Sequence, residues 1–171
     1  MFESLLKEGK IGNLTVKNRI KYAATVNNFC DYKTGAVTER EIGYLRERSE
    51  GGFGIVTTSG GYPHILGKGY IGSMALDSDD HLPGLKRLAQ AMKVDGVIRI
   101  GQVMHTGRYA HPHEYGIKEA IAAGKKVPGM PVGPTAMSSP LKRYAPCREM
   151  SIEEIEEQVE LHAQAARRLK E

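Results

Sequence analysis

The sequence has no tryptophan, three phenylalanines and only two cysteines, Cys30 and Cys147. Because these cysteines lie far apart and form no CxxC pair, the sequence predicts neither a disulfide framework nor a structural zinc site. No stretch approaches the ~20 consecutive apolar residues that a membrane span needs. The first ten residues also lack the apolar core of a signal peptide. We therefore expect a cytoplasmic protein without a membrane partner.

Charge of one sign is not in large excess, since the net charge is only +4 over 171 residues. Basic side chains nevertheless gather between residues 106 and 150, where acidic ones are scarce. Such a segment is usually a solvated loop, and nucleic-acid binding is not favoured, although an anion-binding surface remains an alternative. His105, His111 and His113 lie in or beside this segment without a fourth ligand, so we predict no metal site.

Three β-strands are predicted at regular intervals after an N-terminal hairpin. Residues 9–17 alternate around Gly12-Asn13, which is typical of a short β-hairpin. Strands are then expected over residues 19–24, 54–59 and 97–102. Arg99 lies awkwardly in the third of these strands, since an unpaired charge in a buried strand is costly.

A helix is expected after each strand. Thr38 and Glu41 form the pattern of a capping box, in which each side chain satisfies a backbone N–H group of the other. Pro83 suits the start of a second helix. Ser151 and Glu154 form another capping box, and the helix that follows is expected to bury the apolar stripe Ile152, Ile155, Val159, His162, Ala163, Ala166 and Leu169.

The alternation of strands and helices predicts an α/β fold with a parallel sheet. Either a doubly wound sheet or a (β/α)8 barrel fits this order. No GxGxxG follows the first strand, which weighs against a dinucleotide-binding Rossmann domain.

Several short motifs occur in the order found in one enzyme family. They are Gly12–Ile20, Gly35–Arg40, Gly51-Gly52, Leu82–Leu88, Gly101–Arg108, Gly133–Ala136 and Arg148–Ile155. Together they resemble the old yellow enzyme family, the flavin-dependent NADH:flavin oxidoreductases and their 2,4-dienoyl-CoA reductase relatives. The resemblance extends over nearly the whole chain.

This resemblance implies an FMN-binding (β/α)8 TIM barrel, of which residues 1–171 would form the N-terminal part: a hairpin and about three βα units. Active sites of such barrels lie at the C-terminal ends of the strands. By resemblance, Ala24, Thr25 and Val26 contact the flavin largely through their backbone, and Gly60 lets the chain approach the ring closely. The amide of Gln102 would pair with the donor and acceptor edge of the isoalloxazine.

Val26 departs from the family pattern, because a threonine or cysteine there often hydrogen-bonds the flavin and tunes its potential. Valine has no group that can do so. Thr25 is an uncertain substitute, since successive strand residues face opposite ways.

The family reaction passes a hydride from NAD(P)H to FMN and then to an activated alkene of the enone or enoyl type. The family's catalytic and phosphate-binding residues follow the segment that 152–169 resembles, and a complete barrel takes ~250 residues. We therefore assign no catalytic residue and expect little or no activity from these residues alone. The alternative is a non-enzymatic α/β module that binds through its basic 106–150 loop or self-associates through open sheet edges.

Overall fold

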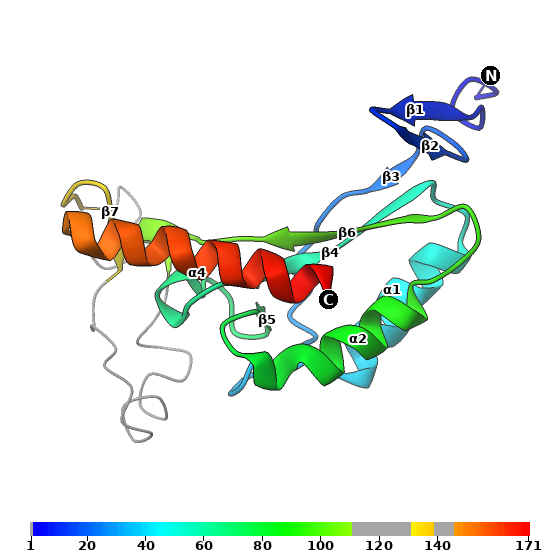
Figure 1. Cartoon of the computed structure of the whole chain (residues 1–171). Helices are drawn as coiled ribbons and strands as arrows, with labels where there is room; N and C mark the ends of the chain where they lie inside the picture. Colours follow the sequence, from blue (N-terminus) through cyan, green and yellow to red (C-terminus); the bar gives the residue numbers. More distant parts are fainter. Residues whose placement is uncertain (1, 111–130, 139–145) are drawn as a thin grey trace.

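The computed structural model describes residues 2–110, 131–138 and 146–171. A parallel sheet runs through the body of the chain, and helices pack along it (Figure 1). Among the described residues, no helix combines the length and the apolar character needed to cross a membrane.

The N-terminal hairpin is present as predicted and projects from the body (Figure 1). Strand β1 (Gly9–Ile11) pairs antiparallel with β2 (Leu14–Val16). Gly12 occupies the turn with φ +56°, in the left-handed region that glycine enters without steric cost. The turn chemistry alone was therefore sufficient to locate this element.

The sheet has four strands, and all its pairings are parallel. Its centre is β4 (Ile55–Tyr62), a β-branched strand whose residues are all buried. β6 (Ile98–Val103) pairs along one edge of β4, while the other edge pairs with β3 (Lys21–Tyr22) and then β5 (Met74–Ala75). The first strand is thus shorter than predicted.

Among the described residues, α1 follows β3, α2 follows β4 and α4 follows β6, in keeping with the predicted βα order. α1 (Glu39–Glu50) and α2 (Leu82–Ala91) lie side by side, and α4 (Ile152–Lys170) runs along β6 (Figure 1). The order is that of part of an α/β barrel.

Short elements complete the described chain. They are the 3-10 turns η1 (Ile65–Gly67), η2 (Asp79–His81) and η3 (Gly107–Tyr109), with the short parallel strands β7 (Val132–Gly133) and β8 (Arg148–Glu149). Most of the basic 106–150 segment, including Lys125, Lys126, Lys142 and Arg143, lies outside the described residues.

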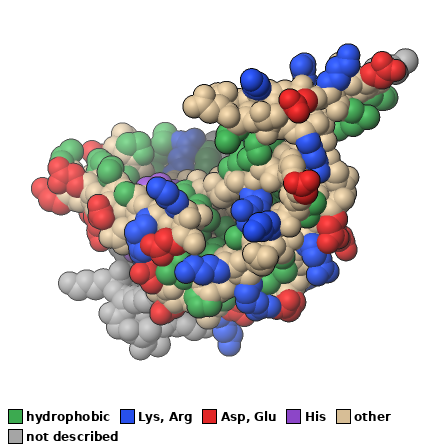
Figure 2. Space-filling model, turned by 45° about the vertical axis from the view of Figure 1, so that its right-hand side comes forward, with side chains coloured by type: hydrophobic (Ala, Val, Ile, Leu, Met, Phe, Trp, Pro, Cys, Tyr) green, Lys and Arg blue, Asp and Glu red, His purple; other side chains and the backbone are tan. Residues whose placement is uncertain are grey.

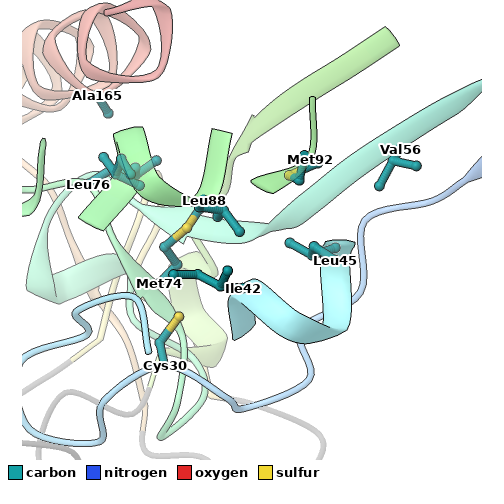
Figure 3. Packing of buried hydrophobic residues seen from close by; sticks show 10 residues of the cluster. Cys30, Ile42, Leu45, Val56, Met74, Leu76, Leu88, Met92 and Ala165 are labelled. Carbon is teal, nitrogen blue, oxygen red and sulfur yellow. The ribbon is translucent and has the colours of Figure 1, made fainter. Parts of the chain in front are cut away.

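The core forms where α1 and α2 pack on β4 and the chain around β5 (Figure 3). Its buried members are Cys30, Ile42, Leu45, Val56, Met74, Leu76, Leu85, Leu88, Met92 and Ala165. Burying one large aliphatic side chain contributes about 1.5–3 kcal/mol, so this cluster supplies most of the attraction between the first two helices and the sheet.

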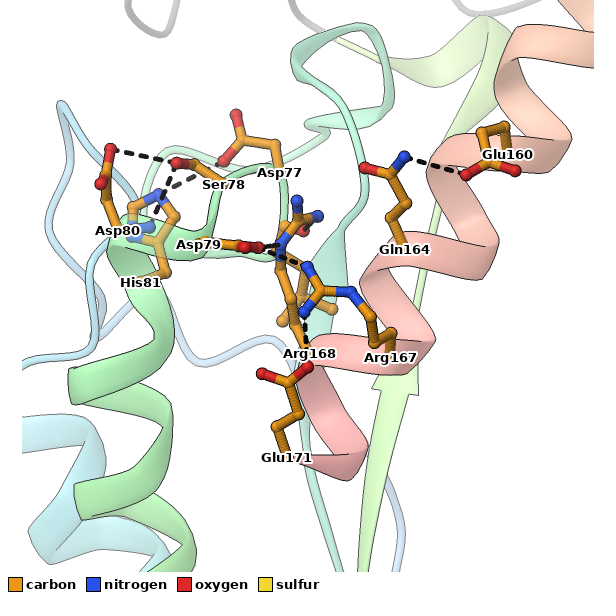
Figure 4. Close-up of polar contacts among 11 residues, drawn as sticks. Asp77, Ser78, Asp79, Asp80, His81, Glu160, Gln164, Arg167, Arg168 and Glu171 are labelled. Atoms are coloured by element: carbon orange, nitrogen blue, oxygen red, sulfur yellow. Dashed lines mark hydrogen bonds and ion pairs between the residues drawn. The ribbon is translucent and has the colours of Figure 1, made fainter.

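Helix α4 packs through a different face from the predicted one. Gln158, Ala165 and Arg168 are buried, whereas Ile152 and Val159 remain 67% and 66% exposed. Its C-terminal end is held by charge, because Nε of Arg168 and Nη2 of Arg167 both lie 2.6 Å from Oδ1 of Asp79 in η2 (Figure 4). The prediction of an apolar inner stripe was wrong for Ile152, Val159, Ala163 and Ala166, all of which are exposed.

Arg99 finds a partner outside the core. Its side chain is on the exposed side of β6, and Nη1 donates to the carbonyl of Ala89 at 2.6 Å, near the end of α2.

Lys and Arg side chains are interspersed with Asp and Glu over the face shown in Figure 2. In the described part of the chain, β6 pairs only with β4, so self-association through an open sheet edge stays a prediction.

Candidate functional site

The predicted site segments meet at the C-terminal ends of β3, β4 and β6. The chain leaving β3 runs beside β4, where Oγ of Ser59 lies 3.0 Å from the carbonyl oxygen of Thr25. On the other side of β4, Gly60 is in register with Gln102 of β6. The structure therefore brings Thr25, Gly60 and Gln102 to one edge of the sheet.

A β-bulge shapes this edge. The register between β4 and β6 shifts between Thr57 and Gly60, so that Thr58 and Ser59 together oppose one residue of β6. The side chain of Thr58 repairs the interrupted ladder, because its Oγ1 accepts from the Gln102 backbone N–H at 3.3 Å and donates to the Ser59 carbonyl at 3.0 Å. Bulges re-aim side chains next to functional sites, and this one lies directly before Gly60.

The segment after β3 presents little side-chain chemistry. Ala24 and Val26 are half-buried, and Thr25 is exposed with its hydroxyl donating to the Ala23 carbonyl at 3.3 Å. β3 ends at Tyr22, so Thr25 lies beyond the strand, and its hydroxyl is directed at the backbone of its own segment. What this segment offers at the edge is mainly its backbone.

Gly60 and Gln102 lie opposite each other but have different surroundings. A Cβ atom at Gly60 would lie 2.9 Å from Sδ of Met104. The side chain of Met104, the residue after β6, therefore fills the space that this glycine leaves. Gln102 is half-buried, and within the described ranges its side-chain amide has no hydrogen-bond partner. Among the described residues, none occupies its donor or its acceptor.

Sequence patterns missed two residues beneath this edge, Glu41 and Ser59. Thr38 caps α1 by accepting from the Glu41 N–H at 3.4 Å, but the reciprocal bond is absent, which corrects half of the predicted capping box. The Glu41 side chain turns inward and is fully buried, with Oε1 2.7 Å from Oγ of Ser59. The sequence did not indicate this contact, because the capping-box motif already accounts for a glutamate at position 41.

The sequence His-Thr-Gly-Arg at residues 105–108 forms the loop after β6. Nδ1 of His105 accepts from the Gly107 N–H at 2.9 Å, and its ring stacks on that of His162 with centroids 5.9 Å apart. Burial, together with the nearby His162 and His64, lowers the pKa of His105 to about 4. His105 is therefore neutral at neutral pH and joins this loop to α4.

No metal centre is evident in the portion of the chain that the structure describes, where no three His, Cys, Asp or Glu residues gather. His111 and His113 lie outside it. A cavity of about 420 Å³ does exist between α2, β6 and α4, but it is lined by residues such as Leu88, Arg99 and Leu169 and by none of the predicted site residues.

Comparison with known proteins shows the family to which this arrangement of strand ends belongs. The sequence model of the NADH:flavin oxidoreductase / NADH oxidase family matches residues 4–171. The chain belongs to this family. Its members are FMN-dependent NAD(P)H oxidoreductases and include the old yellow enzymes, as the motifs predicted.

Individual members of the family match almost the whole chain. The NADH oxidase of Thermoanaerobacter brockii is 33% identical over 172 residues, covering 99% of this chain and 24% of its own length. The structure of a 2-naphthoyl-CoA reductase in complex with 2-naphthoyl-CoA is similar with a TM-score of 0.92 and 66% identity, over 99% of this chain and 26% of that one.

More distant members of the family share the fold. The old yellow enzyme homologue from Zymomonas mobilis has a TM-score of 0.79 at 22% identity, over 96% of this chain and 44% of that one. The chain thus spans about a quarter of the NADH oxidase and of the 2-naphthoyl-CoA reductase, and under half of the old yellow enzyme homologue.

The residues at the strand ends fit one side of an FMN ring. Gln102 has an amide without a partner among the described residues, and Ala24, in the segment after β3, carries only a methyl group. A flavin edge carries neighbouring donors and acceptors, which a carboxamide can match. Val26 has no polar side-chain atom, so the flavin would gain no hydrogen bond there.

Proposed function

We propose that residues 1–171 form one side of the FMN site of a NAD(P)H-dependent oxidoreductase, as the first three βα units of a (β/α)8 barrel. One observation carries the proposal: the backbone at Thr25, the backbone at Gly60 and the amide of Gln102 share one edge of the sheet in a chain that belongs to the flavin family. Edges of this kind hold the active sites of barrels.

Each segment has a distinct part in this proposal. Gln102 binds the polar edge of the ring through its amide, while Ala24, Thr25 and Val26 offer backbone groups beside it. Gly60 leaves room for the side chain of Met104, which packs over β4 between them. When bound, FMN supplies the hydride chemistry between NAD(P)H and the substrate, and the protein positions and polarises.

For the substrate, we propose a conjugated acyl-CoA thioester. The support is that identity to the 2-naphthoyl-CoA reductase reaches 66%, twice the 33% shared with the NADH oxidase, over the same 99% of the chain. This class includes the enoyl type that the sequence resemblance implied.

A chimera tests both proposals. Residues 1–171 would replace the matching segment of the 2-naphthoyl-CoA reductase, and bound FMN and NAD(P)H-dependent reduction of 2-naphthoyl-CoA would be measured. We expect FMN at one per chain and retained activity, and Gln102→Ala in the chimera should weaken FMN binding. A folded chimera without FMN would contradict the flavin site, and one that binds FMN but reduces only simple enones would contradict the thioester.

For the 171 residues by themselves we propose weak FMN binding and little ene-reductase activity, because the family's phosphate-binding residues lie beyond the segment that the chain matches. The absorbance spectrum of the purified chain measures this. Stoichiometric flavin would overturn the proposal.

A further inference from the structure

A buried carboxyl group lies directly beneath the proposed flavin edge. Glu41 is fully buried in the first turn of α1, with Oε1 2.7 Å from Oγ of Ser59. The same Oγ lies 3.0 Å from the carbonyl oxygen of Thr25. Three oxygens from α1, β4 and the segment after β3 thus form one short chain.

Two hydrogen bonds join these three oxygens, and each bond needs one hydrogen atom. The Ser59 hydroxyl supplies only one of the two. A hydroxyl group donates one hydrogen bond and can accept others. If Ser59 donates to the Thr25 carbonyl, which has no proton, then the hydrogen bond to Glu41 requires a proton on the carboxyl. If Glu41 were ionised, it would take the Ser59 proton, and the Thr25 carbonyl would lose its donor.

The surroundings favour the protonated carboxyl. No cation pairs with Glu41 among the described residues, and Arg40 next to it stacks on Phe29 instead. Burial raises the pKa of Glu41, while the Ser59 hydroxyl and the Asn27 amide oppose that rise. The buried Cys30 thiol interacts with Glu41, and burial raises its pKa as well, so it adds no charge at neutral pH. A lone buried carboxylate is costly.

We propose that Glu41 is a positioning residue of the flavin edge: its neutral carboxyl donates to Ser59 Oγ, which donates to the Thr25 carbonyl and so fixes the backbone of residues 23–26 against β4. This rests on the proposed flavin site for its role in binding, but the hydrogen-bonded relay stands on this chain alone. Helix α1 is thereby tied to the two strand ends that would flank the ring.

The protonation of Glu41 is measured directly by infrared difference spectroscopy. Wild-type protein at neutral pH should show the carbonyl band of a buried carboxylic acid, and Glu41→Gln should remove it. A carboxylate band assigned to Glu41 by the same substitution would overturn the proposal.

The positioning role is measured by NMR on the 171-residue chain without flavin. Ser59→Ala and Glu41→Leu should move the carbonyl carbon of Thr25 upfield and lower the backbone order parameters of residues 23–26. Glu41→Gln keeps a donor for Ser59 and should preserve both. Ser49→Ala is the matched control, because Ser49 is also buried and donates to a backbone carbonyl, that of Leu45, at 3.1 Å within α1.

Unchanged Thr25 signals in folded Ser59→Ala would overturn the relay, and Ser59→Ala remains informative if Glu41→Leu does not fold.

The chimera separates the relay from the flavin role. If the relay is correct and supports the site, Ser59→Ala in the chimera weakens FMN binding and Ser49→Ala does not. Altered Thr25 signals with unaltered FMN binding would overturn the positioning role alone, and a wild-type chimera without FMN would count only against the proposed function.

Discussion

Helices α1 and α2 pack on the sheet through apolar side chains, whereas α4 combines a smaller apolar contact with a buried arginine. Ile42, Leu45 and Leu88 are buried in the core with residues of β4 and its neighbours (Figure 3). α4 instead inserts Arg168 and leaves Val159 exposed. The apolar residues of α1 and α2 therefore supply most of the core, whereas α4 contributes only Ala165 and the half-buried Leu169 to it. The predictions below test this contrast, from the largest expected effect to the smallest.

Core truncation should affect the two regions very differently. Leu88→Ala is expected to lower the free energy of unfolding by about 2–5 kcal/mol, since it removes buried contacts and leaves a cavity. Val159→Ala on the exposed face of α4 should change it by about 0.5 kcal/mol or less. Urea unfolding of both variants measures the difference. Equal losses would show that α4 buries Val159 in solution.

The charged attachment of α4 should depend on Arg168 more than on Arg167. Nη1 of Arg168 donates to the Leu76 carbonyl at 2.8 Å in a buried setting, while Arg167 is exposed. Arg168→Ala should cost about 1.5–3 kcal/mol, the usual value of a charge-assisted hydrogen bond, and should speed amide exchange in α4. Arg167→Ala is the control, with a smaller effect expected. Similar exchange in both variants would argue against the buried contact.

Acid should weaken the α4 attachment through Asp79. Its pKa is lowered by Arg168 and Arg167. Stability from Asp79 is therefore present above its ordinary pKa of 3.8 and lost as the pH falls through the lower folded value. Amide signals of α4 recorded down to low pH should show this loss. Asp79→Asn should remove the pH dependence, and its persistence in that variant would contradict the assignment.

The α1 side should respond to pH in the opposite direction. Because the folded pKa of Glu41 is raised, its contribution is fully present below the ordinary value of 4.5 and declines as the pH rises through the folded value. The unfolding free energy of the wild type should thus fall relative to Glu41→Gln as the pH rises from 4.5. A constant difference between the two proteins across that range would refute the raised pKa.

Local chemistry was a sound guide where a few neighbouring residues suffice. Gly12 predicted the hairpin turn, and Thr38 and Ser151 predicted the starts of α1 and α4. The family motifs located the site segments, and the structure brings Thr25, Gly60 and Gln102 to one edge. Whether they bind flavin stays a prediction. The β-bulge at Thr58 and Ser59 could not be predicted, because register depends on the partner strand.

By itself, the sequence determined the elements, their order and the family, since propensity, caps and turns act over a few residues. Only the tertiary structure decided the destinations of three side chains. The Glu41 side chain contacts the buried Ser59 and does not cap its helix. Arg99 points outward to the carbonyl of Ala89, and Arg168 is buried against the carbonyl of Leu76. The physical reason is shared: a charged or acidic group takes the position where distant segments offer it hydrogen bonds, and those segments meet only in the fold.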